Sequence, residues 1–417
     1  MSVSPSREDP GRRSYEPTMS TGAVPDIRLL AGSFYTSDPY PAFAWMREHA
    51  PAYFDEKSGI WGISRYEDVR AIGQDPTSFS SAQGSRPGIA LPMMIDMDAP
   101  EHRRRRRLVS SGFTPQAVHH RQARIMEVCD SIIDAVCENG QCDLVSDIAT
   151  PLPLVMIADM LGFPERDWAK LLHWSDTMLM SQGSSEPDAL GRATEAFVEW
   201  DDYVRRQIAD RRRGGDTDDL LSSLVHAEVG DDVLDIDSLV HEALLILIGG
   251  DETTRHVISG GMEALLCHPQ QLEVLCRDRS GLAAAVEEML RWVSPIKNMN
   301  RTATRDVELH GQVIVAGQGV LLLYPSANRD EAVFARPETF DITRKPNDHL
   351  AFGFGAHLCL GQRLARAELY AMADRLLVRL PDLALADDGP LPLRESNFIV
   401  GLESMPVTFS PTARVGP

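Results

Sequence analysis

The stretch that decides the fold is residues 351–361, Ala-Phe-Gly-Phe-Gly-Ala-His-Leu-Cys-Leu-Gly. Three glycines surround its single cysteine, and glycine is the residue that adopts unusual backbone angles and lets other groups approach the main chain closely. Cys359 stands just before a helical stretch that contains Leu364 and Arg366. Oriented amides at the start of a helix stabilise a thiolate. The pattern therefore favours a cysteine that binds a metal over one that only fills the core.

The composition around this loop is that of an ordinary globular protein. The chain has 417 residues, of which 43% are hydrophobic and 24% charged, so fibrous and wholly disordered classes are excluded. The net charge is −20, which argues against a protein whose main partner is nucleic acid or an anionic membrane. The longest continuous apolar run, residues 243–248, is far shorter than the roughly 18–20 residues that cross a bilayer. We therefore expect no membrane span.

The N-terminal segment differs from the rest. Residues 1–26 are rich in serine, proline and glycine and lack the apolar core of a signal peptide, which predicts a disordered leader. No linker divides residues 27–417, so we expect one domain there. The six cysteines show neither a CxxC pair nor a zinc spacing. Without a secretion signal, the five cysteines other than Cys359 indicate free thiols in a cytoplasmic protein.

The hydrophobic periodicity predicts a mainly α protein with small β-sheets. Apolar spacings of three and four predict helices over residues 114–138, 144–161, 165–181, 190–213, 236–267 and 282–292. Alternating patterns predict a hairpin over 53–65, strands between 301 and 324, and a final extended piece over 398–409.

The longest predicted helix, 237–267, contains the most unusual sequence. At 1.5 Å per residue it is roughly 46 Å long, enough to cross the whole molecule. Gly249 and Gly250 lie in its interior, where each glycine costs roughly 1 kcal/mol relative to alanine. Asp251, Glu252 and Thr253 follow, and a threonine can bond back to the carbonyl four residues earlier and open the turn. This pattern is typical of a kinked core helix with a polar face, or of a backbone that a ligand approaches closely.

Together these residues resemble a known family. The pattern Phe352-Gly353-x-Gly355-x-His357-x-Cys359-x-Gly361 resembles the haem-binding signature of the cytochrome P450 superfamily and matches it at every position. Three further motifs resemble the family in the expected order: His102-x-x-x-Arg106, Gly249-Gly250-Asp251-Glu252-Thr253 and Glu288-x-x-Arg291. The resemblance covers about residues 27–412 and is greatest to actinobacterial hydroxylases of the cholesterol side chain. It implies the cytochrome P450 fold, with haem between the long central helix and the helix after the cysteine loop.

The resemblance also implies a role for each residue of the site. Cys359 is the iron ligand of haem b, and thiolate ligation favours cleavage of the O–O bond. The cofactor-binding residues are His102, Arg106, Arg301 and His357 for the propionates, with Phe352, Gly353, Gly355 and Gly361 in the loop. Thr253 is the hydroxyl of a proton relay beside Gly249 and Gly250, and Glu252 brings protons inward from solvent.

Two sets of charged residues lie outside that catalytic group. Glu288 and Arg291 form a structural ion pair, while Thr339 stands where many members of the family carry a third charged partner. In the run 102–107, helical geometry places only His102 and Arg106 on the haem side, so the other arginines are expected to face solvent. A basic docking surface for an acidic ferredoxin is predicted at Arg103, Arg104, Arg107, Arg363 and Arg366.

The implied function is a haem-thiolate monooxygenase that inserts one oxygen atom of O₂ into an unactivated C–H bond. No flavin or iron–sulfur motif is present, so a ferredoxin and an NAD(P)H-dependent ferredoxin reductase are the implied electron donors. Apolar residues in the family's pocket segments suit a sterol; our candidates are Met93, Ile296, Met299 and Val400. We expect oxidation of cholesterol or cholest-4-en-3-one at C26/C27, with further oxidation of the alcohol.

Other functions stay open at this stage. A methyl-branched lipid or fatty acid, a terpene or a polyketide would also fit an apolar pocket. A haem sensor would not need Glu252 and Thr253, and a peroxygenase would normally lack that acid and alcohol pair. Both alternatives are therefore less consistent with the sequence.

Overall fold

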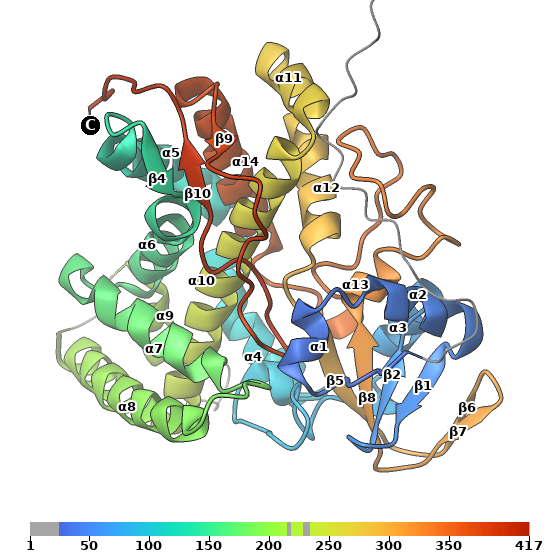
Figure 1. The fold of residues 1–417 in the computed structure, drawn as a ribbon. Coiled ribbons are helices and arrows are strands. Elements are labelled where there is room, and N and C mark those ends of the chain that lie inside the picture. Colours follow the sequence, from blue (N-terminus) through green and yellow to red (C-terminus); the bar gives the residue numbers. More distant parts are fainter. Residues whose placement is uncertain (1–24, 215–217, 228–233, 417) are drawn as a thin grey trace, which may run out of the picture.

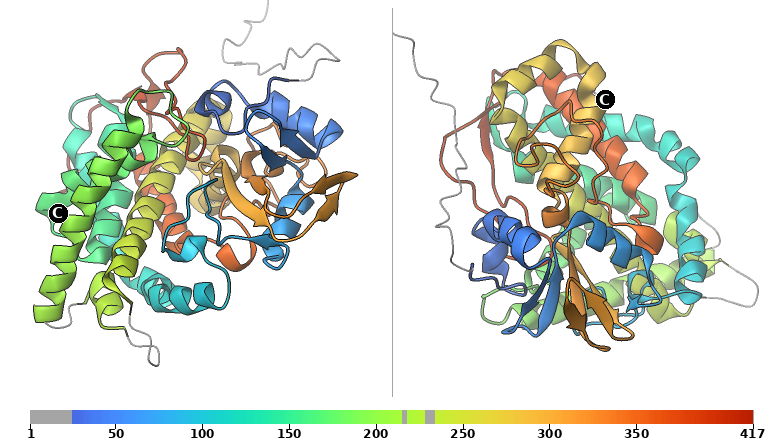
Figure 2. Two further views of the ribbon diagram at one scale, coloured as in Figure 1. Left: turned by 90° about the horizontal axis from the view of Figure 1, so that it is seen from below. Right: turned by 90° about the vertical axis from the view of Figure 1, so that its right-hand side faces the viewer.

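The computed structural model describes residues 25–214, 218–227 and 234–416 (Figure 1). Most helices gather on one side of the molecule, while a five-stranded sheet and the N-terminal helices form the other (Figures 1 and 2). The mainly α architecture with small sheets is thus confirmed. The leader predicted for residues 1–26 lies almost entirely outside the described residues.

Six helices form where the periodicity predicted them. They are α5 (Pro115–Val136), α6 (Pro151–Leu161), α7 (Trp168–Met180), α8 (Ala189–Gly214), α10 (Ile236–Leu266) and α12 (Leu282–Val293). Their ends differ from the predicted ones by only a few residues when the π-helix before α6 is included. The other helices on this side are α4 (Glu101–Val109), α9 (Leu220–Val225), α11 (Pro269–Arg277) and α14 (Gln362–Arg379). A π-helix, Leu144–Ala149, precedes α6. The shorter helices beside the sheet are α1 (Gly32–Thr36), α2 (Tyr40–His49), α3 (Tyr66–Gln74) and α13 (Tyr324–Ala327).

Helix α10 is the axis of the helical side, and local sequence signals set its ends. Asp235 caps its N-terminus by accepting a 2.6 Å hydrogen bond from the amide of Ser238. Its apolar faces pack in one large core with α5, α6, α12 and α14. A Cβ on Gly250 would lie 2.7 Å from Cδ1 of Ile157, so this glycine lets α6 approach α10 closely. The cost of glycine inside the helix is therefore offset by packing.

The larger sheet joins distant parts of the chain. Its order is β1 (Ala52–Asp55), β2 (Ile60–Ile63), β8 (Gly319–Leu323), β5 (Asn298–Ala303) and β3 (Phe79–Ser80). The predicted hairpin of β1 and β2 is present, and β2 pairs in parallel with β8, with Trp61 opposite Val320. The smaller sheets are β4 (Gln141–Asp143) with β10 (Pro406–Thr408) and β9 (Ala384–Leu385), and β6 (Val307–Leu309) with β7 (Gln312–Ile314).

One sequence expectation needs correction. Within residues 398–409 only β10 is a strand, because the residues before it form only isolated bridges, Ile399 with Ile296 and Leu402 with Leu393. One 18-residue window, Leu144–Leu161, is apolar and long enough to cross a membrane, although no continuous apolar run indicated it. However, 78% of this window is buried inside the protein, as in a core helix.

Candidate functional site

The cysteine loop has the geometry that its glycines predicted. Gly353 and Gly355 adopt φ angles of +68° and +74°, in the left-handed region that favours glycine. At Gly355 a Cβ would also lie 2.1 Å from the carbonyl oxygen of Gly73, at the end of α3. The amide of Cys359 donates a 2.9 Å hydrogen bond to the carbonyl of Phe352 and closes the loop. The backbone alone therefore fixes where the thiol lies.

Opposing effects act on the thiol of Cys359. Burial raises its pKa, while the backbone amides of Gly361 and Gln362 and the charge of Arg106 lower it. These amides belong to the first turn of α14, where unpaired N–H groups favour a negative charge. The surroundings of Cys359 thus supply donors for a thiolate sulfur.

Four basic side chains, two from α4, one from β5 and one from the loop itself, converge here. The rings of His102 on α4 and His357 have centroids 4.1 Å apart, and Nε2 of His357 lies 3.1 Å from Oγ of Ser81. Burial and the charges of Arg301, His102 and Arg106 lower the pKa of His357 to about 3. Arg106 donates to the carbonyl of Leu358 at 2.6 Å, and Arg301 to that of Asn300 at 2.7 Å. Each guanidinium keeps further N–H groups, which suits carboxylate ligands.

In the middle of α10, Gly249 and Thr253 lie about one helical turn apart. The hydroxyl of Thr253 donates a 3.0 Å hydrogen bond to the carbonyl of Gly249, which is the back-bond that the sequence suggested. A Cβ on Gly249 would meet no protein atom within 4 Å, in contrast to the tight packing at Gly250. Gly249 and Thr253 therefore present an open stretch of helix to which a flat cofactor and a small molecule can come close.

Glu252 differs from the solvent-connected acid that we expected. Its side chain is fully buried and lies 2.7 Å from Arg255 and 3.2 Å from Arg394. Burial would raise its pKa, but the charges of Arg255 and Arg394 and the contact with His256 hold the pKa well below its usual range. Glu252 is thus an ion-paired carboxylate in this structure, with no direct contact with solvent.

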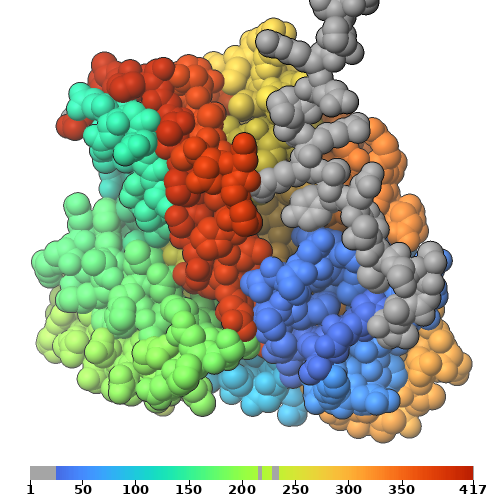
Figure 3. All heavy atoms as spheres, in the orientation of Figure 1, coloured from blue at the N-terminus to red at the C-terminus, as the bar shows by residue number. Residues whose placement is uncertain are grey.

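The partners of Glu252 could not be found in the sequence. Arg394 belongs to the C-terminal segment, which crosses α10 in Figure 1 and covers the surface between α7 and the N-terminal region in Figure 3. Ser175 and Asp176 come from α7. Arg255 and His256, three and four residues after Glu252, had a detectable signal in their helical spacing.

The ion pair between Glu288 and Arg291 is part of a larger buried network. Arg291 donates two 2.8 Å hydrogen bonds to the Glu288 carboxylate. The third charged partner is Arg344, whose Nε lies 3.0 Å from Oε2 of Glu288. Thr339 contributes its backbone carbonyl, which accepts from Arg291 and from Arg344. The departure from the family pattern at Thr339 therefore leaves the network complete.

The arginine run corrects one expectation. Arg103, Arg104 and Arg107 are exposed, but Arg105 turns inward and bonds to the buried carboxylate of Glu242 at 3.3 Å and to Ser238 at 3.1 Å. Helix α4 therefore packs on α10 through Arg105.

The other two arginines of the proposed docking surface, Arg363 and Arg366, differ in their exposure and contacts. Arg363 is exposed, while Arg366 lies over the ring of Phe352 at 4.5 Å and makes two hydrogen bonds, of 2.6 and 2.9 Å, to Glu287. The charge of Arg366 is compensated, and this side chain supports the cysteine loop.

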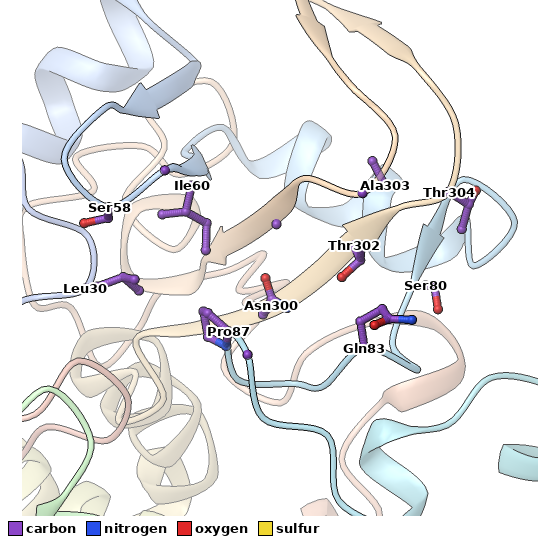
Figure 4. A pocket seen from close by; sticks show the side chains of 14 residues that line it. Leu30, Ser58, Ile60, Ser80, Gln83, Pro87, Asn300, Thr302, Ala303 and Thr304 are labelled. Atoms are coloured by element: carbon purple, nitrogen blue, oxygen red, sulfur yellow. The ribbon is translucent and has the colours of Figure 1, made fainter.

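The four pocket candidates come from different elements, and the amide of Val400 donates a 3.1 Å hydrogen bond to the carbonyl of Pro295, which places Val400 beside Ile296. Ile296 and Met299 pack against the sheet cluster, while Val400 is buried in a separate cluster with the N-terminal helices. Met93 is 7% exposed beside the 94–96 turn. A cavity of about 630 Å³ lies elsewhere, over the edge of the larger sheet, and Asn300, Thr302, Gln83 and Ile60 are among its lining residues (Figure 4). None of the four candidates lines that cavity.

Comparisons with known proteins identify the class. The cytochrome P450 family model matches residues 278–406. The chain is 51% identical over 399 residues to a Mycobacterium tuberculosis protein named steroid C26-monooxygenase, covering 94% of this chain and 99% of that one. It is 38% identical to a methyl-branched lipid omega-hydroxylase of Mycobacterium bovis, with 93% and 95% covered. A Bacillus megaterium P450 solved with testosterone superposes with a TM-score of 0.83 at 32% identity, over 89% of this chain and 98% of that one.

The protein therefore belongs to the cytochrome P450 family and is a monooxygenase. Membership implies a haem-iron cofactor, redox partners, O₂ and an apolar substrate. The donor set fits this cofactor, because one cysteine caged by amides and four basic side chains suit an iron and two propionates. Among the described residues, no group of three or more His, Cys, Asp or Glu side chains could hold a metal ion by itself. A single thiolate is appropriate when a macrocycle supplies the remaining ligands.

Proposed function

We propose that this cytochrome P450 hydroxylates the terminal methyl group, C26 or C27, of the cholesterol or cholest-4-en-3-one side chain and oxidises the alcohol further. The observation that carries the proposal is 51% identity to a steroid C26-monooxygenase along almost the full length of both chains. A second such relative, from Mycolicibacterium smegmatis, is 47% identical over 94% of this chain. The proposal concerns one domain, residues 27–417, in the cytoplasm.

The proposed cofactor is haem b, bound by this chain through three groups of residues. Cys359 supplies the iron ligand, and the amides of Gly361 and Gln362 stabilise its charge. His102, Arg106, Arg301 and His357 would hold the propionates. When bound, haem iron activates O₂ so that one oxygen atom enters a C–H bond and the other becomes water. A ferredoxin and its NAD(P)H-dependent reductase would supply the electrons through the face that carries Arg103, Arg104, Arg107 and Arg363.

Helix α10 would supply protons. The Thr253 hydroxyl donates a 3.0 Å hydrogen bond to the carbonyl of Gly249, and it can turn from there toward a ligand beside this open stretch of helix. Glu252 is the adjacent acid, and proton transfer from a positioned side chain typically contributes 10²–10⁴-fold to a rate. In the structure Arg255 and Arg394 hold Glu252 as a carboxylate, so its use in proton transfer requires that one of these contacts opens.

Tail-first binding explains why a terminal methyl group reacts. Burial of about eight side-chain carbons at roughly 0.8 kcal/mol each gives on the order of 6 kcal/mol before ordering costs. A primary C–H bond is stronger than the tertiary bond next to it, so the pocket must hold the methyl closer to the iron. Ile296, Met299 and Val400 stay our candidates for this restraint, with Met93 at the neighbouring turn.

A second substrate class has its own support. The 38% identical relatives are named for omega-hydroxylation of methyl-branched lipids, which is also oxidation of a terminal methyl. The two substrate classes differ at the end of the molecule that stays far from the iron. A sterol has a fused ring system there, while a methyl-branched lipid has a single chain.

The deciding experiment is a titration of the ferric protein followed by product analysis. Cholest-4-en-3-one should displace the iron-bound water and shift the haem toward high spin, and turnover should give the C26/C27 alcohol and acid. A methyl-branched fatty acid is the comparison ligand. A spectral shift and product only with the fatty acid would overturn the sterol proposal.

A further inference from the structure

At the middle of α10, three carboxyl groups meet two arginines. Arg255 lies 2.6 Å from Asp176 and 2.7 Å from Glu252, and Arg394 lies 2.9 Å from Asp176 and 3.2 Å from Glu252. Both arginines are therefore shared between a carboxylate of α7 and a carboxylate of α10. The third carboxyl group, Asp251, is fully buried beside this ring.

Asp251 is held in a different way from the other two acids. Within the described residues it makes no ion pair with either arginine, and one of its oxygens, Oδ1, has no hydrogen-bond partner. Its other oxygen, Oδ2, lies 2.8 Å from the hydroxyl of Ser175, and that hydroxyl is 3.3 Å from Oε1 of Glu252. Ser175 thus bridges the two neighbouring acids of α10 from the facing helix.

A count of charges shows where a proton belongs. If Asp176, Asp251 and Glu252 were all ionised, Arg255 and Arg394 would leave one negative charge, which is costly because Asp251 and Glu252 are fully buried and only Asp176 is partly exposed. One proton makes the cluster neutral. Asp251 is the group that lacks an arginine, and burial and the charge of Glu252 raise its pKa.

The other titratable groups near Asp251 do not supply the missing charge. Burial lowers the pKa of His256 to about 4, although Glu252 lies 3.5 Å away, so this ring is neutral at physiological pH. On α14, burial and the charge of Asp251 raise the pKa of Glu368 to about 8, which favours its neutral form. The proton of the cluster is therefore assigned to Asp251.

We propose that Asp251 stores a proton for oxygen activation and passes it through the hydroxyl of Ser175 to Glu252. This inference rests on the proposed role of Glu252 and Thr253 in proton supply. The O–H bond of Asp251 breaks as a new O–H bond forms on Ser175, whose own proton moves to Oε1 of Glu252. No electrons move, and a proton from water later restores Asp251.

Asp176 controls when the proton can be transferred to Glu252. While Arg255 and Arg394 both bind Glu252, its carboxylate is a poor proton acceptor, because their charges hold its pKa low. Each guanidinium already touches Asp176, so a small turn toward Asp176 frees Glu252 to accept the proton. Since Asp176 and Ser175 are neighbours on α7, the position of that helix sets both the proton path and its release.

The test compares two oxidants in Ser175→Ala, Asp251→Asn and Asp176→Asn, with cholest-4-en-3-one as substrate. With O₂ and NADH, the rate of product formation should fall by roughly 10²-fold in the first two variants, and the solvent isotope effect should change. Asp176→Asn should slow the same reaction by less. With hydrogen peroxide, which brings its own protons, all three should keep the wild-type rate. Ser175→Thr retains a hydroxyl and should restore NADH-driven turnover.

Ser181→Ala is the matched control, because its hydroxyl lies at the end of the same helix and bonds only to the local carbonyl of Met178 at 2.8 Å. Equal losses with both oxidants would mean that the cluster is merely structural, and unchanged NADH-driven turnover in Ser175→Ala would reject the relay. If the wild type oxidises no sterol with either oxidant, the proposed function fails instead. Infrared spectroscopy tests the stored proton directly. At neutral pH the wild type should show the C=O band of a protonated carboxylic acid, and this band should be missing from Asp251→Asn. If the wild type lacks the band, the proposal is overturned.

Discussion

The cysteine loop and the acid cluster on α10 are built in opposite ways. The loop is one continuous stretch whose geometry comes from its own backbone, with Gly353 and Gly355 at positive φ. The cluster is assembled from α7, α10 and the C-terminal segment, and it is held by side chains alone. A site whose geometry comes from the backbone tolerates few substitutions. A site held by side chains can be adjusted by single substitutions.

The strongest test of this contrast removes the thiol. Cys359→Ala should abolish thiolate ligation completely, since no neighbouring residue can replace the sulfur. The measurement is the Soret band of the reduced protein with CO, which should move to the position of a non-thiolate haem or vanish. Cys267→Ala is the control and should leave the spectrum unchanged. A thiolate-type band in Cys359→Ala would overturn the assignment.

The next test asks whether the loop depends on its backbone. Gly355→Ala places a Cβ 2.1 Å from the carbonyl of Gly73 at a φ of +74°, so the free energy of unfolding should fall by more than the roughly 1–3 kcal/mol of strained backbone alone. Gly311→Ala is the matched control, because its φ is +73° and nothing lies within 4 Å. Denaturant unfolding measures both. Equal losses would show that the close contact with α3 is unimportant.

On α10, next to the acid cluster, Thr253→Ala should leave substrate binding intact and divert electrons from product formation to hydrogen peroxide. Loss of the hydroxyl removes the proton donor beside Gly249. We therefore expect the ratio of product formed to NADH consumed to fall by about 10-fold, which is less than the 10²–10⁴-fold typical of general acid–base catalysis. NADH consumption, peroxide and product are measured together. Ser259→Ala, which removes a similar back-bond to Arg255 further along α10, should keep the wild-type ratio.

The smallest effect, a change in the free energy of unfolding, is expected at Glu287, which binds Arg366 beside the cysteine loop. His349 and Arg366 contact Glu287; burial alone would raise its pKa, but these two partners lower it to about 2. The folded pKa is below the usual 4.5, so the stabilisation is present above about pH 4.5 and is lost as the pH falls toward 2. Because the group is partly exposed, we expect Glu287→Gln to remove only about 1 kcal/mol of this pH-dependent stability. Unfolding at several acidic pH values measures it, and an unchanged pH profile in the variant would contradict it.

The same contrast explains what the sequence could predict. The cysteine loop and the helices were accessible because their signals are local: the 114–138 prediction matches α5 within two residues at each end. Arg344 was missed as the third partner of Glu288, and Ser175 and Arg394 as neighbours of Glu252, because only the tertiary fold brings them together. Arg105 was assigned to solvent because helical periodicity alone does not show the buried carboxylate of Glu242.

The parallel pairing of β2 with β8 has a consequence for the newly made chain. Trp61 cannot meet Val320 until the ribosome has synthesised more than 250 further residues, which takes on the order of tens of seconds at about 5–20 residues per second. During that time the β1–β2 hairpin has an unpaired edge and an uncovered aromatic side chain. Cys359 follows still later, so the cofactor can be captured only by a nearly complete chain. The N-terminal hairpin is therefore the segment of the nascent protein that most needs protection from aggregation.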